Sequence, residues 1–578
     1  MKILLTAINA KYIHSNLAVY SLWAFAAETR QGYRNSVEIA EYTINQRVDD
    51  ILIDLYMRKP DIVCFSCYLW NIVYVEQLVK ELRKVLPDLE IWLGGPEVSF
   101  HAAEFLKKMP QVRGIMCGEG EETFLDLLEY YHGTGLPLEE ITGIVYTEDA
   151  KCQEEKRERK IVANPPRAAL DLDRLPFVYE DLDVFQNKII YYESSRGCPF
   201  SCSYCLSSID KCLRFRNIET VKQELQFFID QEVPQVKFVD RTFNCRHDHA
   251  FAIWSYLAEH DKGKTNFHFE VAADLLREEE LRLITSMRPG LIQLEIGVQS
   301  TNERTIREIR RSMKFQQVKE AVRRIHAAAN IHQHLDLIAG LPYEDYESFR
   351  KSFNEVYALH PEQLQFGFLK VLKGSYMEEQ AKSYGLLYQD RPPFEVLSTR
   401  WLSYEELIRL KRIEEMVEVY YNSSQFLHTM EILEQVFPDA FSMYEELSHY
   451  YERHHLYGIS HSRIERYEIL SAFVEEYDRE RKEEYREMLT YDLYLRENVK
   501  NRPAFSGISS VTKEEETAFY EQEAVSHQYL KGYEQYDKRQ MRKMTHLERV
   551  KGSVLLFDYR NRDLLTNQAS VCEVSVKT

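Results

Sequence analysis

The stretch RGCPFSCSYC, residues 196–205, carries the most specific signal in the chain. It places Cys198, Cys202 and Cys205 in a C-x3-C-x2-C spacing, directly after an apolar run that predicts a β-strand. Three thiols in one short loop are typical of a soft-metal site, and the main candidates are an iron–sulfur cluster and zinc. Structural zinc normally takes four protein ligands, and no further Cys or His stands at a conventional spacing. The pattern favours a cluster with one iron free for a small molecule, with zinc as the alternative.

The strand before these cysteines opens a series of alternating strands and helices. Strands are expected at 188–194, 236–240, 267–271, 291–297, 334–339 and 364–370. Six such units predict a (β/α)6 partial TIM barrel over residues 186–375, with its chemistry at the carboxyl ends of the strands.

A separate alternation of short apolar strands and helices occupies residues 1–145. It predicts an α/β fold, a doubly wound Rossmann-like domain whose parallel sheet is covered on both faces. No GxGxxG motif follows the first strand, so a dinucleotide site is not indicated. Residues 146–185 are charged and broken by prolines, which predicts an extended linker.

From residue 376 the spacing of apolar residues becomes helical, and residues 376–578 are expected to form a mainly helical domain. Ser403 and Glu406 form a capping-box motif ahead of an apolar helix face. The run VLLFDY at 554–559 predicts a terminal strand or hairpin.

Charge and composition restrict the partners and the location. With 92 acidic and 73 basic residues, the net charge of −19 disfavours binding to nucleic acid or to anionic membranes. The basic residues between 538 and 551 are therefore interpreted as a solvated helix face. No run approaches the ~20 apolar residues that cross a bilayer, and the polar start of the chain does not resemble a signal peptide. We expect a cytoplasmic protein with reduced thiols.

The central segment resembles the radical SAM superfamily. Cys198, Cys202 and Cys205 match the cluster motif of that superfamily, and Tyr204 occupies the aromatic position before the last cysteine. The resemblance implies a [4Fe–4S] cluster whose open iron is chelated by the amino and carboxylate groups of S-adenosylmethionine (SAM). Reductive cleavage of SAM would then give a 5′-deoxyadenosyl radical. It also implies an external reductant such as flavodoxin or ferredoxin.

Further residues stand where this superfamily contacts SAM. They are Asp240 in FVDRTFN, Glu270 in HFEVAADLL, Glu295 and Gln299 in LEIGVQS, and Gly340 in LIAGLPYE. The resemblance implies that Asp240 meets the methionine amine and that Gly340 lets adenine lie against the backbone. The alternatives are a salt-bridged barrel carboxylate for Glu270 and an ordinary turn for Gly340.

The N-terminal domain resembles the cobalamin-binding domains that precede many radical SAM barrels. Ser66 in FSCYL and the pair Gly94 and Gly95 in LGGPEVS match two of their motifs, and the glycine pair would let the backbone approach the corrinoid. The run GEGEET at 118–123 resembles the motif that ends this type of domain, with an acidic helix start as its alternative.

The first cobalamin motif, D-x-H-x-x-G, is incomplete here. Counting from His14, Tyr12 replaces the aspartate and Leu17 replaces the glycine. A metal-ligating histidine is normally oriented by an acid on its other ring nitrogen, and none stands two residues away. We therefore expect cobalamin with a weak or absent axial ligand from His14, or a loop histidine at this position.

These features predict a cobalamin-dependent radical SAM enzyme. Methyl transfer to an unactivated carbon of a small-molecule or peptide substrate is the favoured reaction, and the sequence does not name that substrate. Two alternatives stay open: a radical SAM enzyme of another reaction type, and a non-catalytic redox sensor. The resemblance assigns no function to residues 376–578.

Overall fold

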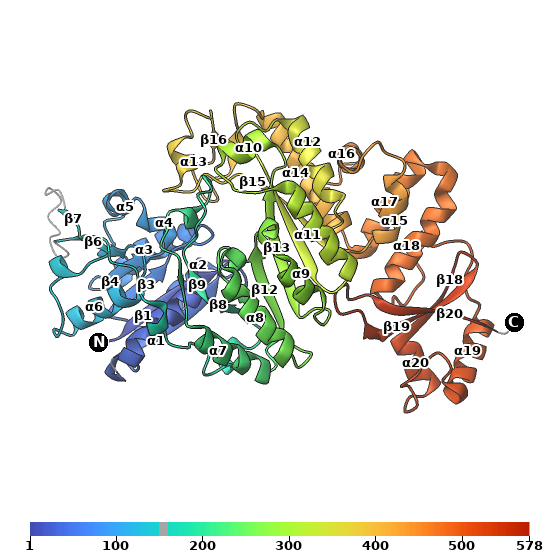
Figure 1. The fold of residues 1–578 in the computed structure, drawn as a ribbon, viewed down its shortest axis with the longest axis horizontal. Coiled ribbons are helices and arrows are strands. Elements are labelled where there is room, and N and C mark those ends of the chain that lie inside the picture. The colour runs from blue at the N-terminus through green and yellow to red at the C-terminus, as the bar shows by residue number, and fades with distance from the viewer. Residues whose placement is uncertain (30, 149–159, 577–578) are drawn as a thin grey trace.

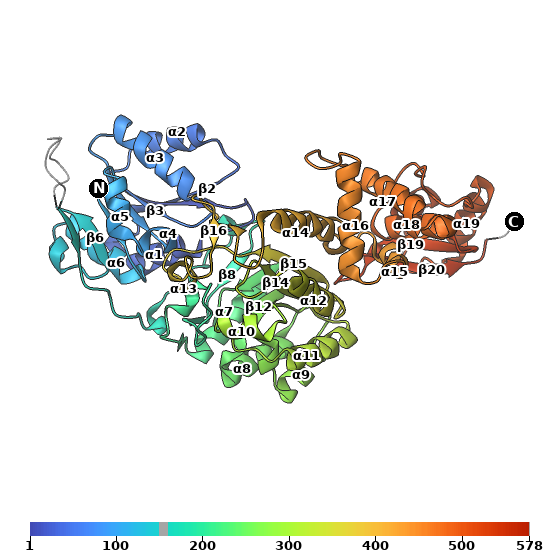
Figure 2. The same cartoon turned by 90° about the horizontal axis from the view of Figure 1, so that it is seen from above.

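The computed structural model describes residues 1–29, 31–148 and 160–576. The chain forms an N-terminal α/β domain, a central β/α domain and a C-terminal, mainly helical domain (Figures 1 and 2). In both views the central domain lies between the other two, so the order along the chain is also the order in space. The predicted fold class is confirmed.

The N-terminal domain contains a seven-stranded sheet in the order β2-β1-β3-β4-β5-β6-β7. Its parallel strands are β1 (Ile3–Asn9), β2 (Val37–Thr43), β3 (Ile62–Ser66), β4 (Glu90–Gly94) and β5 (Gly114–Met116). The main covering helices are α1 (Leu17–Thr29), α2 (Val48–Arg58), α3 (Ile72–Val85), α5 (Ala102–Lys108) and α6 (Glu121–Tyr131). Every residue of β1 is buried, and its side chains alternate between two separate apolar cores because helices cover both faces.

The expected linker contributes to this sheet. Strands β6 (Ile144–Thr147) and β7 (Ile161–Ala163) extend it by antiparallel pairing beyond β5. Apolar side chains such as Ile144 and Tyr146 are buried there, which favours a strand over an open connector. Residues 149–159 of the predicted linker lie outside the described residues. The irregular connector between the domains therefore starts after β7, later than the prediction of residue 146.

The central domain is a six-stranded parallel sheet in the order β15-β14-β13-β12-β11-β8. The strands are β8 (Ile190–Tyr192), β11 (Gln235–Phe238), β12 (Asn266–Val271), β13 (Ile292–Gln299), β14 (His332–Ala339) and β15 (Gln363–Phe368). Between them lie α7 (Ile218–Asp230), α8 (His247–His260), α9 (Glu278–Thr285), α11 (Phe315–Ala328) and α12 (Tyr346–Tyr357). Each connection moves one strand along the sheet, as in part of a β/α barrel.

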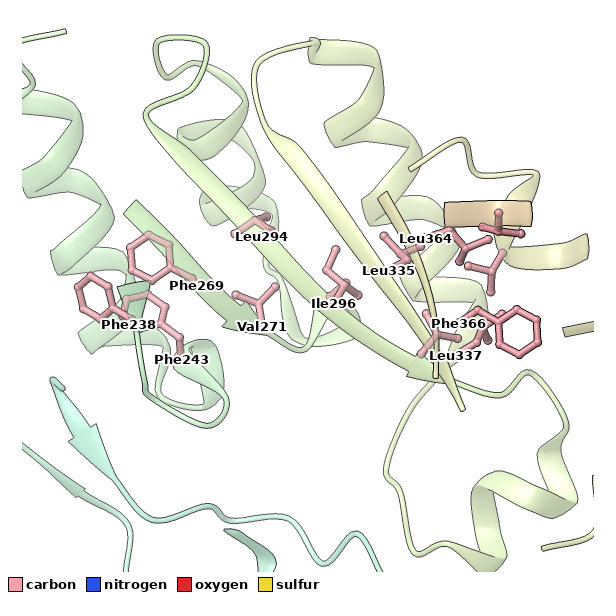
Figure 3. Close-up of a cluster of buried hydrophobic side chains, with 14 of the residues drawn as sticks. Phe238, Phe243, Phe269, Val271, Leu294, Ile296, Leu335, Leu337, Leu364 and Phe366 are labelled. Carbon is pink, nitrogen blue, oxygen red and sulfur yellow. The ribbon is translucent and has the colours of Figure 1, made fainter. Parts of the chain in front are cut away.

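The two faces of this sheet differ in chemistry. Figure 3 shows apolar side chains such as Phe269, Leu294 and Leu335 in the buried cluster of the central domain. Because strand side chains alternate between faces, the residues between them face the other way. This opposite face, which we call the inner face, carries polar and ionisable residues: Tyr191, Lys237, His268, Glu270, Glu295, His334 and Asp336.

The C-terminal domain combines helices with a small sheet. The helices are α14 (Tyr404–Val417), α15 (Leu427–Glu434), α16 (Ala440–Arg453), α17 (Arg463–Tyr477), α18 (Lys482–Arg496), α19 (Lys513–Ser526) and α20 (Lys538–Met544). Strands β18 (Thr545–Val550), β19 (Ser553–Arg562) and β20 (Ala569–Val574) form an antiparallel sheet, and β19 contains the predicted strand VLLFDY. The predicted capping box of Ser403 and Glu406 is confirmed at the start of α14.

The basic stretch in this domain faces acidic residues of α19. Lys538 lies 3.0 Å from Glu521, and Arg549 lies 2.7 Å from Glu515. These pairs neutralise part of the basic charge that the sequence analysis interpreted as a solvated helix face. Among the described residues, no helix has the length and apolar character needed to span a bilayer.

A matched pair of glycines tests the packing at the end of β4. Gly95 has φ +109°, and a Cβ there would lie 2.4 Å from the carbonyl oxygen of Cys67, whereas Gly118 has φ +82° with no atom within 4 Å. Alanine costs about 1–2 kcal/mol at either position because of the left-handed backbone. At Gly95 we expect about 1–3 kcal/mol more from the clash. Thermal denaturation of Gly95→Ala and Gly118→Ala measures the difference, and equal losses would contradict the close approach.

Candidate functional site

The cysteine loop lies between two short antiparallel strands, β9 (Ser195–Arg196) and β10 (Arg214–Phe215). The backbone N–H of Cys198 donates to the carbonyl of Asp210 at 3.2 Å, which closes the loop. Gly197 has φ +96°, and a Cβ there would lie 2.5 Å from the carbonyl oxygen of Cys212. Only glycine fits this approach, so the residue before the first cysteine is set by the fold of the loop.

The three loop thiols are free and largely enclosed. Cys198 and Cys202 are buried, and Cys205 is half-buried. Burial raises the pKa of the Cys198 thiol, and the neighbouring thiols of Cys205 and Cys202 raise it further. Cys198 therefore lies within electrostatic reach of the other two thiols, in surroundings that oppose its free thiolate. Soft sulfur donors in such a place fit an iron–sulfur group, which stabilises thiolates by coordination.

A half-buried arginine that the sequence analysis missed contacts this loop. Arg311 donates through Nη1 to Cys202 Sγ at 3.8 Å and to the Tyr204 hydroxyl at 3.3 Å. Its Nη2 donates to the carbonyl of Gly297 on β13. Burial alone would lower the pKa of Arg311, but Tyr204 and Cys202 beside it raise the pKa above its ordinary value. No motif marks this arginine, since only the fold brings it to the cysteines.

Asp240 follows β11 and is 1% exposed. Its carboxylate accepts hydrogen bonds from the Ser194 backbone at 3.0 Å and from the hydroxyls of Ser194 and Ser195 at 2.6 Å. Burial raises the pKa of Asp240 to about 6, although these hydrogen bonds act in the opposite direction. The observed partners belong to the segment that leads into the cysteine loop, so Asp240 anchors that segment.

Gln299 ends β13 in a strained conformation. Its φ is +71°, and its buried side-chain oxygen Oε1 has no hydrogen-bond partner among the described residues. Its amide nitrogen lies 2.4 Å from where a Cβ of Gly297 would be, so the glycine makes room for it. Backbone strain together with an unpaired buried acceptor is typical of a ligand contact.

The other expected SAM contacts have protein neighbours. Glu270 lies 3.7 Å from Arg241, in line with the barrel salt bridge considered as its alternative. Glu295 accepts from Lys237 at 3.0 Å; burial would raise the pKa of Glu295, but His268 and Lys237 lower it to about 2. Gly340 has φ +89°, and a Cβ there would lie 2.8 Å from Val396 of β17 (Val396–Ser398), so both the backbone turn and the packing favour glycine.

The N-terminal domain turns the carboxyl ends of its strands toward the central domain. Its strand order reverses between β1 and β3, the position where α/β sheets of this type bind ligands. Ser66 ends β3 and accepts a hydrogen bond from Asn16 at 3.3 Å. Tyr12 after β1 is 65% exposed and Trp70 after β3 is 43% exposed. Large exposed apolar side chains at a switch point fit a flat macrocycle such as a corrin.

His14 joins the two domains. Its Nδ1 shares a 2.6 Å hydrogen bond with the hydroxyl of Tyr191 on β8, and Ser15 donates to the carbonyl of Ile189 at 3.2 Å. Burial lowers the pKa of His14, and Lys11 and Lys237 lower it further. Tyr191, which the sequence analysis missed, thus contacts one of the two ring nitrogens of His14.

The GEGEET run ties the N-terminal domain to the cysteine loop. Glu121 accepts from Arg196 at 2.9 Å, and Arg196 stands two residues before Cys198. Glu119 accepts from Arg214 on β10 and from the backbone of Leu170 at 2.7 Å. Burial alone would raise the pKa of Glu119, but Arg214 and Leu170 hold it below its ordinary value. Acidic groups at the start of α6 therefore bind both arginines that flank the cysteines.

Family models match the three parts of the chain. Residues 3–128 match the B12 binding domain, and residues 192–356 match the Radical SAM superfamily. The chain joins a B12-binding domain to a radical SAM domain. The three cofactors predicted from the sequence, a [4Fe–4S] cluster, SAM and cobalamin, are those of these two domain types. Residues 382–571 match a protein family of unknown function, DUF4080.

Curated relatives share the first two domains. The cobalamin-dependent radical SAM methyltransferase TokK of Streptomyces tokunonensis is 25% identical over 58% of this chain and 51% of its own length. The anaerobic magnesium-protoporphyrin IX monomethyl ester cyclase of Rubrivivax gelatinosus is 23% identical over 56% of this chain and 58% of its own length. The chain thus spans about half the length of these relatives.

Solved structures share the fold. The radical enzyme OxsB with aqua-cobalamin and SAM bound superposes with a TM-score of 0.56 at 16% identity, over 85% of this chain and 78% of OxsB. The methyltransferase TsrM of Kitasatospora setae, with cobalamin and a [4Fe–4S] cluster bound, gives 0.53 at 15% identity, over 68% of this chain and 79% of TsrM.

The anchoring role of Asp240 in the radical SAM domain predicts a pH dependence. Its folded pKa of about 6 lies above the ordinary 3.8, so the folded protein holds this proton more tightly than the unfolded chain. Between pH 3.8 and about pH 6, the free energy of unfolding of wild type should fall relative to that of Asp240→Asn as the pH rises. The fall should be up to about 1.4 kcal/mol per pH unit. Denaturant unfolding from pH 4 to 7 measures this difference. The exposed Asp248→Asn is the control, and parallel profiles of wild type and Asp240→Asn would contradict the assignment.

Proposed function

We propose that this protein is a cobalamin-dependent radical SAM enzyme that transfers a methyl group to an unactivated carbon. The observation that carries the proposal is the meeting of the cysteine loop with the ligand edge of the B12-binding domain. Arg196, two residues before Cys198, pairs with Glu121, and Tyr191 on the first barrel strand pairs with His14. Both cofactor sites therefore border one interface, as a reaction that uses both requires.

Each of the proposed cofactor sites has residues suited to the cofactor that it would bind. Cys198, Cys202 and Cys205 would hold the cluster, and Arg311 supports the loop through Cys202 and Tyr204. Gln299 offers an unpaired acceptor for SAM, while Asp240 positions the loop. Ser66, Gly94, Gly95 and His14 would border the cobalamin. When bound, the cluster and SAM supply a carbon radical, and cobalamin supplies a methyl group.

The protein groups contribute orientation and shielding. Arg311 places an N–H donor at Cys202 Sγ, and such a donor stabilises negative charge on sulfur. Buried side chains around Cys198 and Cys202 exclude water from the reactive end of the barrel. A reductant must deliver the electron, and Cys205 is the least buried of the three cysteines.

A second reaction class is kept because of the relatives. TokK is a methyltransferase, whereas the similarly distant Rubrivivax gelatinosus protein is a cyclase. A radical reaction without methyl transfer is therefore the runner-up. Incubation with methyl-labelled SAM, a reductant and cell extract separates the two: methyl transfer labels a product, and the runner-up forms 5′-deoxyadenosine without labelling one. A redox sensor would cleave no SAM after reduction.

The cluster assignment predicts different behaviour for neighbouring cysteines. Serine at Cys198, Cys202 or Cys205 should abolish the cluster absorbance and electron paramagnetic resonance (EPR) signal after anaerobic reconstitution, because serine is a poor ligand for iron–sulfur clusters. Cys212→Ser is the matched control, since Cys212 is exposed and lies in the same loop. We expect the control to keep its cluster and all four variants to keep bound cobalamin. Equal cluster loss in Cys212→Ser would refute the ligand set.

The surroundings of His14 predict the state of cobalt. Because the ring is held by Tyr191 and no carboxylate among the described residues is hydrogen-bonded to it, we expect a base-off Co(II) EPR spectrum without nitrogen splitting from the protein. His14→Ala should leave that spectrum unchanged. A three-line nitrogen pattern in wild type that disappears in His14→Ala would show an axial histidine instead.

A further inference from the structure

The inner face of the radical SAM domain contains a cluster of possible metal ligands that does not include the cysteines. Glu295 on β13 and His334 and Asp336 on β14 each offer one ligand atom, and these atoms all lie within 4.8 Å of one another. The strand register pairs Glu295 with His334 and Gly297 with Asp336. Because Gly297 has no side chain, the Gln299 amide and the Arg311 guanidinium lie close to its backbone, next to Asp336 on the same face.

The atoms of this cluster are short of hydrogen bonds. His334 is 8% exposed, and its Nε2 lies 3.2 Å from Asp336 Oδ1, yet neither atom has a hydrogen-bond partner among the described residues. Because this nitrogen and this oxygen are close together but not hydrogen-bonded, each can direct a lone pair at the same bound ion. Buried polar atoms are normally satisfied, so an unsatisfied pair of this kind points to a ligand contact.

Charged side chains of both signs lie near this cluster. Lys237 lies 3.0 Å from Glu295, and Arg241 lies 3.7 Å from Glu270. Within the ranges that the structure describes, no Lys or Arg forms an ion pair with Asp336. The carboxylates of Glu295 and Asp336 lie within 4.8 Å of each other, and a metal ion between Asp336, His334 and Glu295 would reduce the cost of holding two like charges close together in a buried site.

We propose that Glu295, His334 and Asp336 bind one divalent first-row transition-metal ion on the inner face of the barrel. One imidazole nitrogen and two carboxylate oxygens suit Mn²⁺, Fe²⁺ or Zn²⁺, whereas iron–sulfur clusters prefer the thiolates of the cysteine loop. Three protein ligands leave coordination positions open, as in catalytic metal sites. The ligands that fit these positions are anionic oxygen groups, such as a carboxylate of a bound substrate.

The test uses the full chain, freed of metal and titrated anaerobically with Mn²⁺, and EPR measures free Mn²⁺. We expect one Mn²⁺ per chain and an increase in the thermal midpoint on binding. His334→Gln and Asp336→Asn should each weaken binding at least tenfold. Pulsed EPR of saturated wild type should show coupling to an imidazole nitrogen, and His334→Gln should lose it.

Two controls isolate the site. His332→Gln removes a histidine from the same strand and face, two residues before His334, and should bind Mn²⁺ as wild type does. The triple variant with serine at Cys198, Cys202 and Cys205 should also bind one Mn²⁺, which separates this site from the cluster and from the proposed function. Circular dichroism verifies that each variant is folded.

Three results would overturn the proposal: wild type that binds no Mn²⁺ at millimolar concentration, folded His334→Gln and Asp336→Asn that bind as tightly as wild type, or loss of binding in the triple cysteine variant. The last result would place the ion at the cysteines.

Discussion

The ion pairs of Arg196 are the interaction on which the geometry of the two cofactor domains depends. Arg196 lies between Glu193 of its own segment and Glu121 of the B12-binding domain, at 2.7 and 2.9 Å. A largely buried guanidinium and its carboxylates are stable only together, because each alone would remain uncompensated away from water. Since Cys198 stands two residues further along, this network sets where the cysteine loop faces the other domain.

The two faces of the central sheet carry different kinds of side chain. Aliphatic and aromatic residues pack on one side, as Figure 3 shows, while histidines, carboxylates and Lys237 alternate with them on the inner face. Parallel strands buried on both sides are usually apolar throughout. The polar alternation here therefore reflects a face kept for ligands, and both Gln299 and the Glu295–His334–Asp336 cluster belong to it.

The C-terminal domain attaches on the other side of the barrel. Helix α16 meets α12 there, where Arg350 pairs with Asp439 at 2.7 Å and Tyr346 donates to Glu445 at 2.5 Å. Figures 1 and 2 show this domain at the opposite end of the molecule from the B12-binding domain. The contacts of α16 thus stabilise the last barrel units.

Local pattern by itself determined the three-part architecture and the cysteine loop. The spacing of apolar residues identifies strands and helices, and the spacing of the three cysteines identifies a metal-binding loop. Both signals are local, so they can be read without knowing any long-range contact. Only the tertiary structure decided the partners that come from distant segments. Arg311 reaches Cys202 from 109 residues away, Tyr191 reaches His14 from 177 away, and strand register alone brings Glu295 beside His334. The tertiary structure also decided the pairing of β6 with β7 at the edge of the sheet. The charged residues and prolines nearby predicted a linker, because they mask the short apolar segments that form these strands. Long-range pairing depends on how sheets and domains pack, and one sequence carries no local signal for it.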